Sequence, residues 1–251
     1  MFRRGVESFQ HGLGRYFVVS VRIKHWRHTS DAGDGSWASM VVRLEPGVDL
    51  IHRDLLERLR YADHAVYEFV AESSTETLDV PLRRLSEAAN YSRLWLTIAS
   101  VMYAFGGSEA RRAIPSGVVA IAATSFLVNV VIKSKFGRAR PDRNPDLVPD
   151  KRKVPMPEST SFPSGHSASA FAFATAVGHQ LPTVALPLRV LAAAVAYSRV
   201  HSGVHYPADA IGGSIIGIAM GHIAARISRF RSLDMTSSDS PKPADDLACQ
   251  A

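Results

Sequence analysis

The chain has 251 residues, a length that fits one domain or one domain with tails. Its formal net charge is +6, so an anionic partner is expected: nucleic acid, acidic lipid or phosphate. A single cysteine, Cys249, excludes a disulfide framework within the chain and a thiol-based metal site. The mean hydropathy is close to zero, but this average hides polar ends and an apolar stretch over 94–225.

Residues 1–49 carry scattered Arg, His, Gly and Ser with no sustained hydrophobic period. Their one apolar run, 16–21, is too short for the core of a signal peptide, and no small-residue cleavage site follows it. We therefore interpret 1–49 as a poorly ordered N-terminal extension, with Met40 as an alternative start.

The region 50–92 has helical periodicity. From 54 to 70, apolar residues recur every three or four positions with Arg, Glu and Asp between them. This pattern predicts an amphipathic helix, suited to a membrane interface or to the surface of a bundle. A second short helix is predicted to begin after Asp79, which we interpret as its cap, and to run to Ala89.

Five apolar segments follow, and the second has nineteen residues without a charge. A bilayer crossing needs roughly 17–20 apolar residues, so the second segment meets that length and the others are shorter. Their close succession and their many small side chains favour a membrane-embedded bundle. We predict an all-α fold with about five transmembrane helices over 93–231, preceded by the amphipathic helix and followed by a disordered, Ser- and Pro-rich tail over 232–251. The segments are 94–105, 114–132, 166–181, 184–197 and 210–225.

Three polar clusters lie at the ends of these segments. The first is the block 133–141 after the second segment, which contains four basic residues: Lys133, Lys135, Arg138 and Arg140. Taken alone, such a block is typical of a basic stop signal at a membrane surface.

The second cluster, Ser-Phe-Pro-Ser-Gly-His-Ser over 161–167, opens the third segment. Ser164 is a favourable N-cap, and free backbone N–H groups at this helix start, including that of Gly165, favour an anion. Taken alone, the cluster is a capped helix with a nearby histidine, His166. A serine hydrolase is disfavoured because the cluster has no G-x-S-x-G pattern.

The third cluster joins the fourth and fifth segments. Pro207 suits the first turn of a helix, so His205 is expected just ahead of that helix and Asp209 in its first turn. A carboxylate there can orient the imidazole and raise its basicity. His201, His205 and Asp209 also have the spacing of a metal site on one helix. The intervening glycine and proline argue against a continuous helix, and the accompanying Lys and Arg repel a cation.

Together the clusters contain the groups that phosphoryl transfer needs. Three cations and two neutral donors can hold the non-bridging oxygens of a phosphoryl group and stabilise charge in an in-line transition state. Two histidines in different surroundings supply a nucleophile and an acid. The candidate phosphate-binding residues are Lys133, Arg140, Arg199, Ser164 and Gly165.

The order of these blocks resembles the type 2 phosphatidic acid phosphatase and vanadium haloperoxidase superfamily. The resemblance spans 94–225 and implies a helical bundle, usually of six membrane helices, with the active site at one membrane face. The five apolar segments depart from that number, so the first helix of the usual bundle is either missing or replaced by the amphipathic helix. The matching blocks are Lys133-x6-Arg140-Pro141, Pro163-Ser164-Gly165-His166 and Ser198-Arg199-x5-His205-x3-Asp209.

By this match, His205 is the nucleophile that forms a covalent phosphohistidine, and Asp209 orients it. His166 would protonate the leaving oxygen and later activate the hydrolytic water. The five phosphate-binding candidates would hold the phosphate. The resemblance implies a hydrolase that needs no metal and no other cofactor. Its lipid-phosphate substrate would be a phosphatidate, a phosphatidylglycerol phosphate, or a polyprenyl phosphate or diphosphate.

Three alternatives stay open at this point. A soluble acid phosphatase of the same superfamily would need a signal peptide and helices with alternating polar and apolar faces, unlike the second segment. A vanadium haloperoxidase shares the site, because vanadate mimics phosphate, but those enzymes are much larger. A basic membrane protein that binds acidic lipid without catalysis would not explain Ser-Gly-His and His-x3-Asp beside the cations.

The expected partners are the lipid substrate and the bilayer. No interleaved aromatic pattern indicates nucleic-acid binding, and no obligate protein partner is evident. The expected location is the plasma membrane, crossed several times. The positive-inside rule places the end of the bundle that carries additional arginines in the cytoplasm, and therefore the site on the extracytoplasmic face. Those arginines are Arg111, Arg112, Arg226, Arg229 and Arg231.

Overall fold

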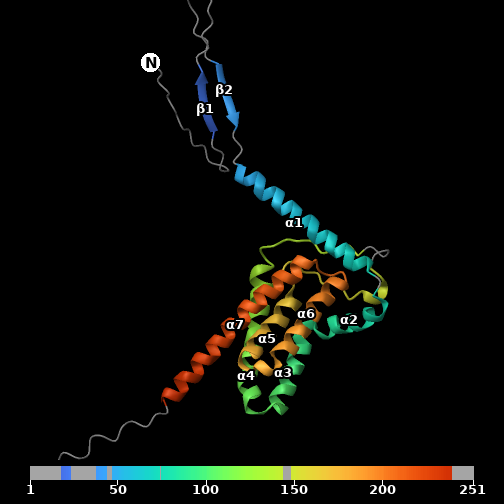
Figure 1. Cartoon of the computed structure of the whole chain (residues 1–251), viewed down its shortest axis with the longest axis vertical. Coiled ribbons are helices and arrows are strands. Elements are labelled where there is room, and N and C mark those ends of the chain that lie inside the picture. Colours follow the sequence, from blue (N-terminus) through green and yellow to red (C-terminus); the bar gives the residue numbers. More distant parts are fainter. Residues whose placement is uncertain (1–17, 24–37, 44–46, 74, 144–147, 239–251) are drawn as a thin grey trace, which may run out of the picture. The chain divides into compact units, whose positions relative to one another are not determined.

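The structure is a computed structural model that describes residues 18–23, 38–43, 47–73, 75–143 and 148–238 (Figure 1). The chain divides into two compact units, residues 1–62 and 63–251.

In the first unit, strands β1 (Val18–Ile23) and β2 (Ala38–Arg43) pair antiparallel, with Val18 opposite Arg43 and Ile23 opposite Ala38. Both strands are rich in β-branched residues, which suit a pleated backbone. The sequence analysis did not predict this pair within the extension 1–49. The remainder of that extension ahead of helix α1 lies outside the described residues.

Helix α1 (Gly47–Glu72) contains the predicted amphipathic helix and begins before it. Within the second unit, α1 buries Tyr67 and Ala71 and leaves Val66 and Phe69 exposed. Apolar residues that stay exposed beside a buried face are suited to a membrane interface.

Helix α2 (Glu76–Ala88) begins earlier than predicted, with Thr75 at its N-cap position. The prediction that Asp79 caps this helix was therefore wrong. Asp79 lies inside the helix and is buried, and its Oδ1 accepts a hydrogen bond from Nε of Arg152 at 2.7 Å. The Asp79 carboxylate thus forms a long-range ion pair with Arg152 instead of capping the helix.

The apolar half of the chain folds into five longer helices, with α5 in the middle, packed against α4, α6 and α7 (Figure 1). Eleven of the 16 residues of α5 are buried, which explains why its sequence is apolar on every side. The helices are α3 (Arg93–Phe105), α4 (Gly107–Phe126), α5 (Gly165–Gln180), α6 (Ala185–His201) and α7 (Pro207–Ser238). The short turns are η1 (Asn90–Ser92), the π-helical η2 (Leu127–Ile132), η3 (Asp150–Arg152) and η4 (Pro182–Val184).

Among the described residues, three helical stretches are long and apolar enough to cross a membrane: Gly107–Ile132, Pro182–His201 and Pro207–Phe230. The helical bundle confirms the predicted fold class. Helices α3 and α5, with 13 and 16 residues, are shorter, so the count of about five crossings stays a prediction.

The closest helix contact in the bundle is that of α7 with α5, and it depends on three glycines spaced four residues apart. A Cβ atom at Gly213 or Gly217 would overlap a backbone carbonyl oxygen of α5 or its N-cap, and one at Gly221 would lie 2.7 Å from the Ala172 oxygen. Small residues at this spacing let two helix backbones approach closely, the usual device of membrane bundles.

Helix α7 continues to Ser238, past residue 231 where the disordered tail was expected to begin. The sequence contains no Gly or Pro from 232 until Pro241, so nothing local ends the helix sooner. The rest of the predicted tail, 239–251, lies outside the described residues.

The glycine contact predicts a selective effect of added volume. Gly217→Val should lower the free energy of unfolding by about 1–3 kcal/mol, because a side chain there forces α5 and α7 apart. The matched control is Ala219→Val, which adds volume on an exposed side of the same helix. Melting temperatures in detergent would test this, and equal values for both variants would contradict the packing role of Gly217.

Candidate active site

The N-terminus of α5 is capped as predicted. Oγ of Ser164 accepts hydrogen bonds from the N–H of Ser167 at 3.4 Å and from its hydroxyl at 3.0 Å. The N–H groups of Gly165 and His166 belong to the first turn and have no intrahelical partner. This end of α5 therefore offers backbone donors to an anion.

The turn between α6 and α7 places His205 just ahead of Pro207, the first residue of α7, as predicted. Gly203 makes this turn with a φ of +70°, and a Cβ there would lie 2.8 Å from Cγ of Arg143. Both the left-handed conformation and the close approach require glycine. His205 itself is buried, with 1% of its surface exposed.

The alternative of a metal site on one continuous helix does not match the structure, because α6 ends at His201 and α7 begins only at Pro207. Nε2 of His201 lies 2.8 Å from the hydroxyl of Thr75 and 3.3 Å from Oδ1 of Asp79. His201 therefore belongs to a separate buried cluster with Asp79 and Arg152.

His205 and Asp209 approach each other through Ser161. The hydroxyl of Ser161 donates to Oδ2 of Asp209, and its oxygen lies 3.4 Å from Nδ1 of His205. The direct distance from Nδ1 to Oδ2 is 3.6 Å. Because the carboxylate takes the hydroxyl proton, the serine oxygen is left to accept, and Nδ1 of His205 must carry a hydrogen.

The other ring nitrogen of His205 faces a cation. Nη1 of Arg140 lies 3.3 Å from Nε2 of His205. A guanidinium can only donate, so Nε2 is the unprotonated nitrogen. Two independent neighbours thus select the same tautomer, with the lone pair of Nε2 on the side of Arg140.

Burial lowers the pKa of His205 to about 4, and the charges of Arg140 and Arg199 act in the same direction, against the carboxylate of Asp209. The imidazole is therefore neutral at pH 7. Since the folded pKa lies below the ordinary value of 6.5, the stability that this histidine contributes is complete above that value and is lost as the pH falls towards 4.

Arg140 is held in place by main-chain groups. Its Nη1 donates to the carbonyl of Val204 at 2.7 Å, and its Nε donates to that of Ser159 at 2.8 Å. Nζ of Lys133 reaches the hydroxyl of Ser159 at 3.0 Å. Burial, together with the charges of the nearby Arg140 and Arg199, lowers the pKa of Lys133 to about 8. A cluster of cations that depress one another's pKa values is a strong candidate for an anion site.

Arg199 lies behind this cluster and is 1% exposed. Its Nη1 donates to the hydroxyl of Ser86 at 2.6 Å, whereas its Nε has no hydrogen-bond partner among the described residues. Buried guanidinium groups normally have their N–H groups satisfied, so this one retains a donor for a ligand.

Most of the predicted site residues line one cavity of about 570 Å³. It lies between the start of α5, the end of α4 with η2, the turn η1 and the loop over 155–159. Three predicted residues do not line it: Ser164 caps α5, and Arg199 and Asp209 are buried behind it. The predicted residues in its wall are Lys133, Arg140, Gly165, His166 and His205.

His166 is held by a residue that the sequence analysis missed. Its Nε2 lies 2.8 Å from the amide oxygen of Asn90, which also lines the cavity. An amide oxygen accepts, so Nε2 of His166 carries the proton at the cavity wall. The histidines thus have opposite tautomers, one with a lone pair and one with a proton available.

Sequence reasoning also missed Arg138, whose guanidinium donates to Oδ1 of Asp209 at 2.8 Å. Arg138 lies in the basic block between Lys133 and Arg140, the two fixed positions of the motif. It is not itself a fixed position, so the motif gave no reason to single it out. Ser161 opens the second block and carried no separate signal. Asn90 had none, because its role depends on a contact with a histidine 76 residues away.

Comparisons with known proteins agree with this geometry. The family model of the PAP2 superfamily matches residues 116–232. The decaprenylphosphoryl-5-phosphoribose phosphatase of Mycolicibacterium smegmatis is 35% identical over 134 residues, which cover 52% of this chain and 68% of that protein. The chain belongs to the PAP2 superfamily.

Other PAP2 relatives and structures are also similar. The undecaprenyl-diphosphatase BcrC of Bacillus subtilis is 26% identical over 132 residues, 52% of this chain and 66% of that one. Across the curated relatives, the chain spans between about one third and two thirds of their length. The crystal structure of LpxE from Aquifex aeolicus has a TM-score of 0.54 at 25% identity, covering 64% of this chain and 93% of that one. A transmembrane PAP2-type phosphatidylglycerolphosphate phosphatase from Bacillus subtilis has a TM-score of 0.55 at 21% identity, covering 69% and 87%, and shares the fold.

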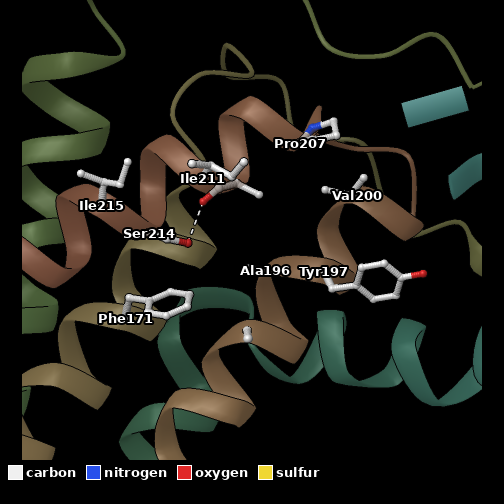
Figure 2. A pocket seen from close by; sticks show the side chains of 10 residues that line it. Phe171, Ala196, Tyr197, Val200, Pro207, Ile211, Ser214 and Ile215 are labelled. Atoms are coloured by element: carbon white, nitrogen blue, oxygen red, sulfur yellow. Dashed lines mark hydrogen bonds between the residues drawn. The ribbon is translucent and has the colours of Figure 1, made fainter. Parts of the chain in front are cut away.

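A second cavity of about 390 Å³ is separate from the site (Figure 2). It lies among α5, α6 and α7 and is lined mainly by apolar side chains, including Phe171 and Ile211. Ser214 also lines this cavity, and its hydroxyl already donates to the carbonyl of Ala210 at 2.7 Å. Phe171 lines this second cavity, whereas Ser169 lines the first. The two residues are two positions apart and therefore lie on opposite faces of α5. The predicted site residues that line a cavity are therefore all in the first one.

The lowered pKa of Lys133 predicts pH-dependent anion binding. As the pH rises through about 8, the free protein loses this cation, so its affinity for inorganic phosphate should fall about 10- to 100-fold between about pH 7.5 and 10. Titration calorimetry would measure this, and Lys133→Arg should remove most of the decrease because arginine stays charged.

Lys135→Arg is the matched control, since Lys135 is exposed and does not line the cavity. It should keep the wild-type pH profile. A pH-independent affinity in the wild type would show that Lys133 does not contact the anion.

Proposed function

We propose that this chain is a metal-independent phosphatase that hydrolyses a lipid phosphate through a phosphohistidine on His205. The observation that carries the proposal is the tautomer of His205: Ser161 accepts from Nδ1, and Arg140 faces Nε2. The nucleophilic lone pair thus lies among cations in the wall of the cavity.

In the first step, Nε2 of His205 attacks phosphorus, and the bond from phosphorus to the leaving oxygen breaks. With the anionic substrate bound, His166 takes up a second proton from solvent; the resulting imidazolium donates its Nε2 proton to that oxygen, and the lipid product leaves. Asp209, through Ser161, stabilises the positive charge that forms on the His205 ring.

In the second step, water attacks the phosphohistidine, and the bond from phosphorus to nitrogen breaks. His166, now without its proton, accepts one from this water. Inorganic phosphate leaves, His205 returns to its starting tautomer, and His166 is again an imidazolium. Lys133, Arg140 and the first-turn N–H groups of α5 stabilise the transferring phosphoryl group in both steps.

The cations take the place that metal ions occupy in other phosphatases. Lys133 and Arg140 line the cavity with the two histidines, and Arg199 lies directly behind. A divalent cation would have to enter this positive field, which opposes its binding.

A lipid substrate is supported by the relatives and by the three apolar helices. The names of the relatives specify a decaprenylphosphoryl phosphoribose, an undecaprenyl diphosphate and a phosphatidylglycerophosphate as substrates. What these share is a phosphate near a long apolar chain. The cavity lies at the end of a membrane-length helix, Gly107–Ile132, where such a phosphate would meet the protein.

We further propose that the cavity lies at the extracytoplasmic face of the plasma membrane. Lys133 follows the C-terminal end of this helix, and Arg111 and Arg112 lie near its start. Arg226 and Arg229 are likewise far along α7 from Asp209. The positive-inside rule then places the arginine-bearing end of the bundle in the cytoplasm.

The test is phosphate release from a panel of lipid phosphates by detergent-purified protein in the presence of a chelator. The panel contains a phosphatidate, a phosphatidylglycerol phosphate, and a polyprenyl phosphate and diphosphate. We expect turnover of at least one of them, inhibition by vanadate, and a decrease of more than about 10³-fold in kcat for His205→Ala, which lacks the nucleophile.

His222→Ala is the matched control, because His222 is exposed on α7 and distant from the cavity lining. It should retain wild-type turnover. Full activity of His205→Ala, or a strict requirement for a divalent metal, would contradict the mechanism.

A further inference from the structure

Asp63 of α1 contacts two parts of the catalytic region. Its Oδ2 accepts a hydrogen bond from Nη2 of Arg138, and its Oδ1 accepts one from the N–H of Ala208 at 2.7 Å. The side chain is only 8% exposed. The N–H of Ala208 belongs to the first turn of α7 and has no intrahelical partner, so Asp63 satisfies it from another helix.

Arg138 connects Asp63 to the catalytic carboxylate. Its Nη1 donates to Oδ1 of Asp209 at 2.8 Å, and its guanidinium lies over the ring of Tyr206, 4.3 Å from the centroid. One planar guanidinium thus joins two carboxylates and stacks on the residue that follows His205.

The two oxygens of Asp209 have different tasks. Oδ2 accepts from Ser161 and from the N–H of Tyr206 at 2.9 Å, which places it on the side of His205. Oδ1 accepts from Arg138. The rotation of the carboxylate, and with it the position of Ser161 against His205, therefore depends on Arg138.

Helix α1 also covers the catalytic turn. The rings of His64 and Tyr67 lie with centroids 4.5 Å and 5.4 Å from that of Tyr206. These residues and Asp63 precede the region 116–232 that the PAP2 model matches. The contact therefore involves residues outside the matched region.

We propose that Asp63 and Arg138 are a positioning pair through which α1 sets the orientation of the Asp209–Ser161–His205 chain. This rests on the proposed function. Neither residue lines the cavity, so neither is assigned contact with the substrate.

When Asp63 is changed to asparagine, the buried Asp209 still accepts hydrogen bonds from Ser161 and from the N–H of Tyr206, and Arg138, which is 27% exposed, keeps access to water. Asp63→Asn should therefore act on turnover more than on folding. Arg138→Gln also removes a partner of a buried carboxylate, so its kcat is compared on folded protein only.

The experiment compares Asp63→Asn, Arg138→Gln and the double variant in the lipid phosphatase assay, with kcat expressed per monodisperse protein. Asparagine can still accept from the N–H of Ala208 but loses the charge that tethers Arg138. We expect kcat to fall about 10- to 100-fold in Asp63→Asn, with KM within about twofold, because small misplacements of reacting groups cost about that much.

Two further comparisons separate positioning from a general structural effect. If Asp63 acts through Arg138, Asp63→Asn should add almost nothing in the Arg138→Gln background. Asp63→Glu, which keeps the charge, should recover part of the lost kcat. Glu68→Gln is the matched control, an acid-to-amide change at an exposed site of the same helix, and should behave as the wild type.

A wild-type kcat in Asp63→Asn would overturn the positioning pair, as would an equal loss in both backgrounds. Turnover by the wild type and its absence in His205→Ala carry the proposed function separately. Failure of the Asp63 prediction alone therefore leaves the phosphatase mechanism standing.

Discussion

The position of Asp209 depends on hydrogen bonds from three other parts of the chain. Its side chain accepts from Ser161, Arg138 and the N–H of Tyr206, while its backbone carbonyl accepts from the N–H of Ser164 at 3.0 Å. A fully buried carboxylate is unfavourable without such partners. Satisfying this one group therefore fixes the starts of α5 and α7 and the basic segment after α4 in a single arrangement, and the phosphate site lies between them.

The cations of the site work against stability. Arg140 and Arg199 are close enough to Lys133 to lower its pKa. In addition, Nε of Arg199 has no hydrogen-bond partner in the described part of the chain. Sequences optimised only for folding avoid such a cluster, because like charges repel and an unpaired buried donor is costly. In the proposed function, a bound phosphoryl group would remove both penalties at once, and the unfavourable free energy of the empty cluster would favour binding of the anion.

Local rules predicted the helix starts of the site well, because a cap or an N1 proline is decided within a few residues. Ser164 and Pro207 took their expected places, which brought His205 near Asp209. Asp79 has the same local signal but pairs with Arg152, 73 residues away. Such pairs leave no trace in the periodicity or composition of one sequence. Burial has a similar ambiguity: a helix enclosed on all sides, like α5, is as uniformly apolar as one that faces lipid.

Three of the contacts that were missed involve the region ahead of the matched domain. Asp63 of α1 holds Arg138, Ser86 of α2 holds Arg199, and Asn90 of η1 holds His166. Residues 116–232 contain the proposed reacting groups and phosphate-binding cations, whereas these three supports come from residues 63–90. Helices α1 and α2 are therefore parts of the site's framework. The second compact unit begins at Asp63, so it includes all three of these supports.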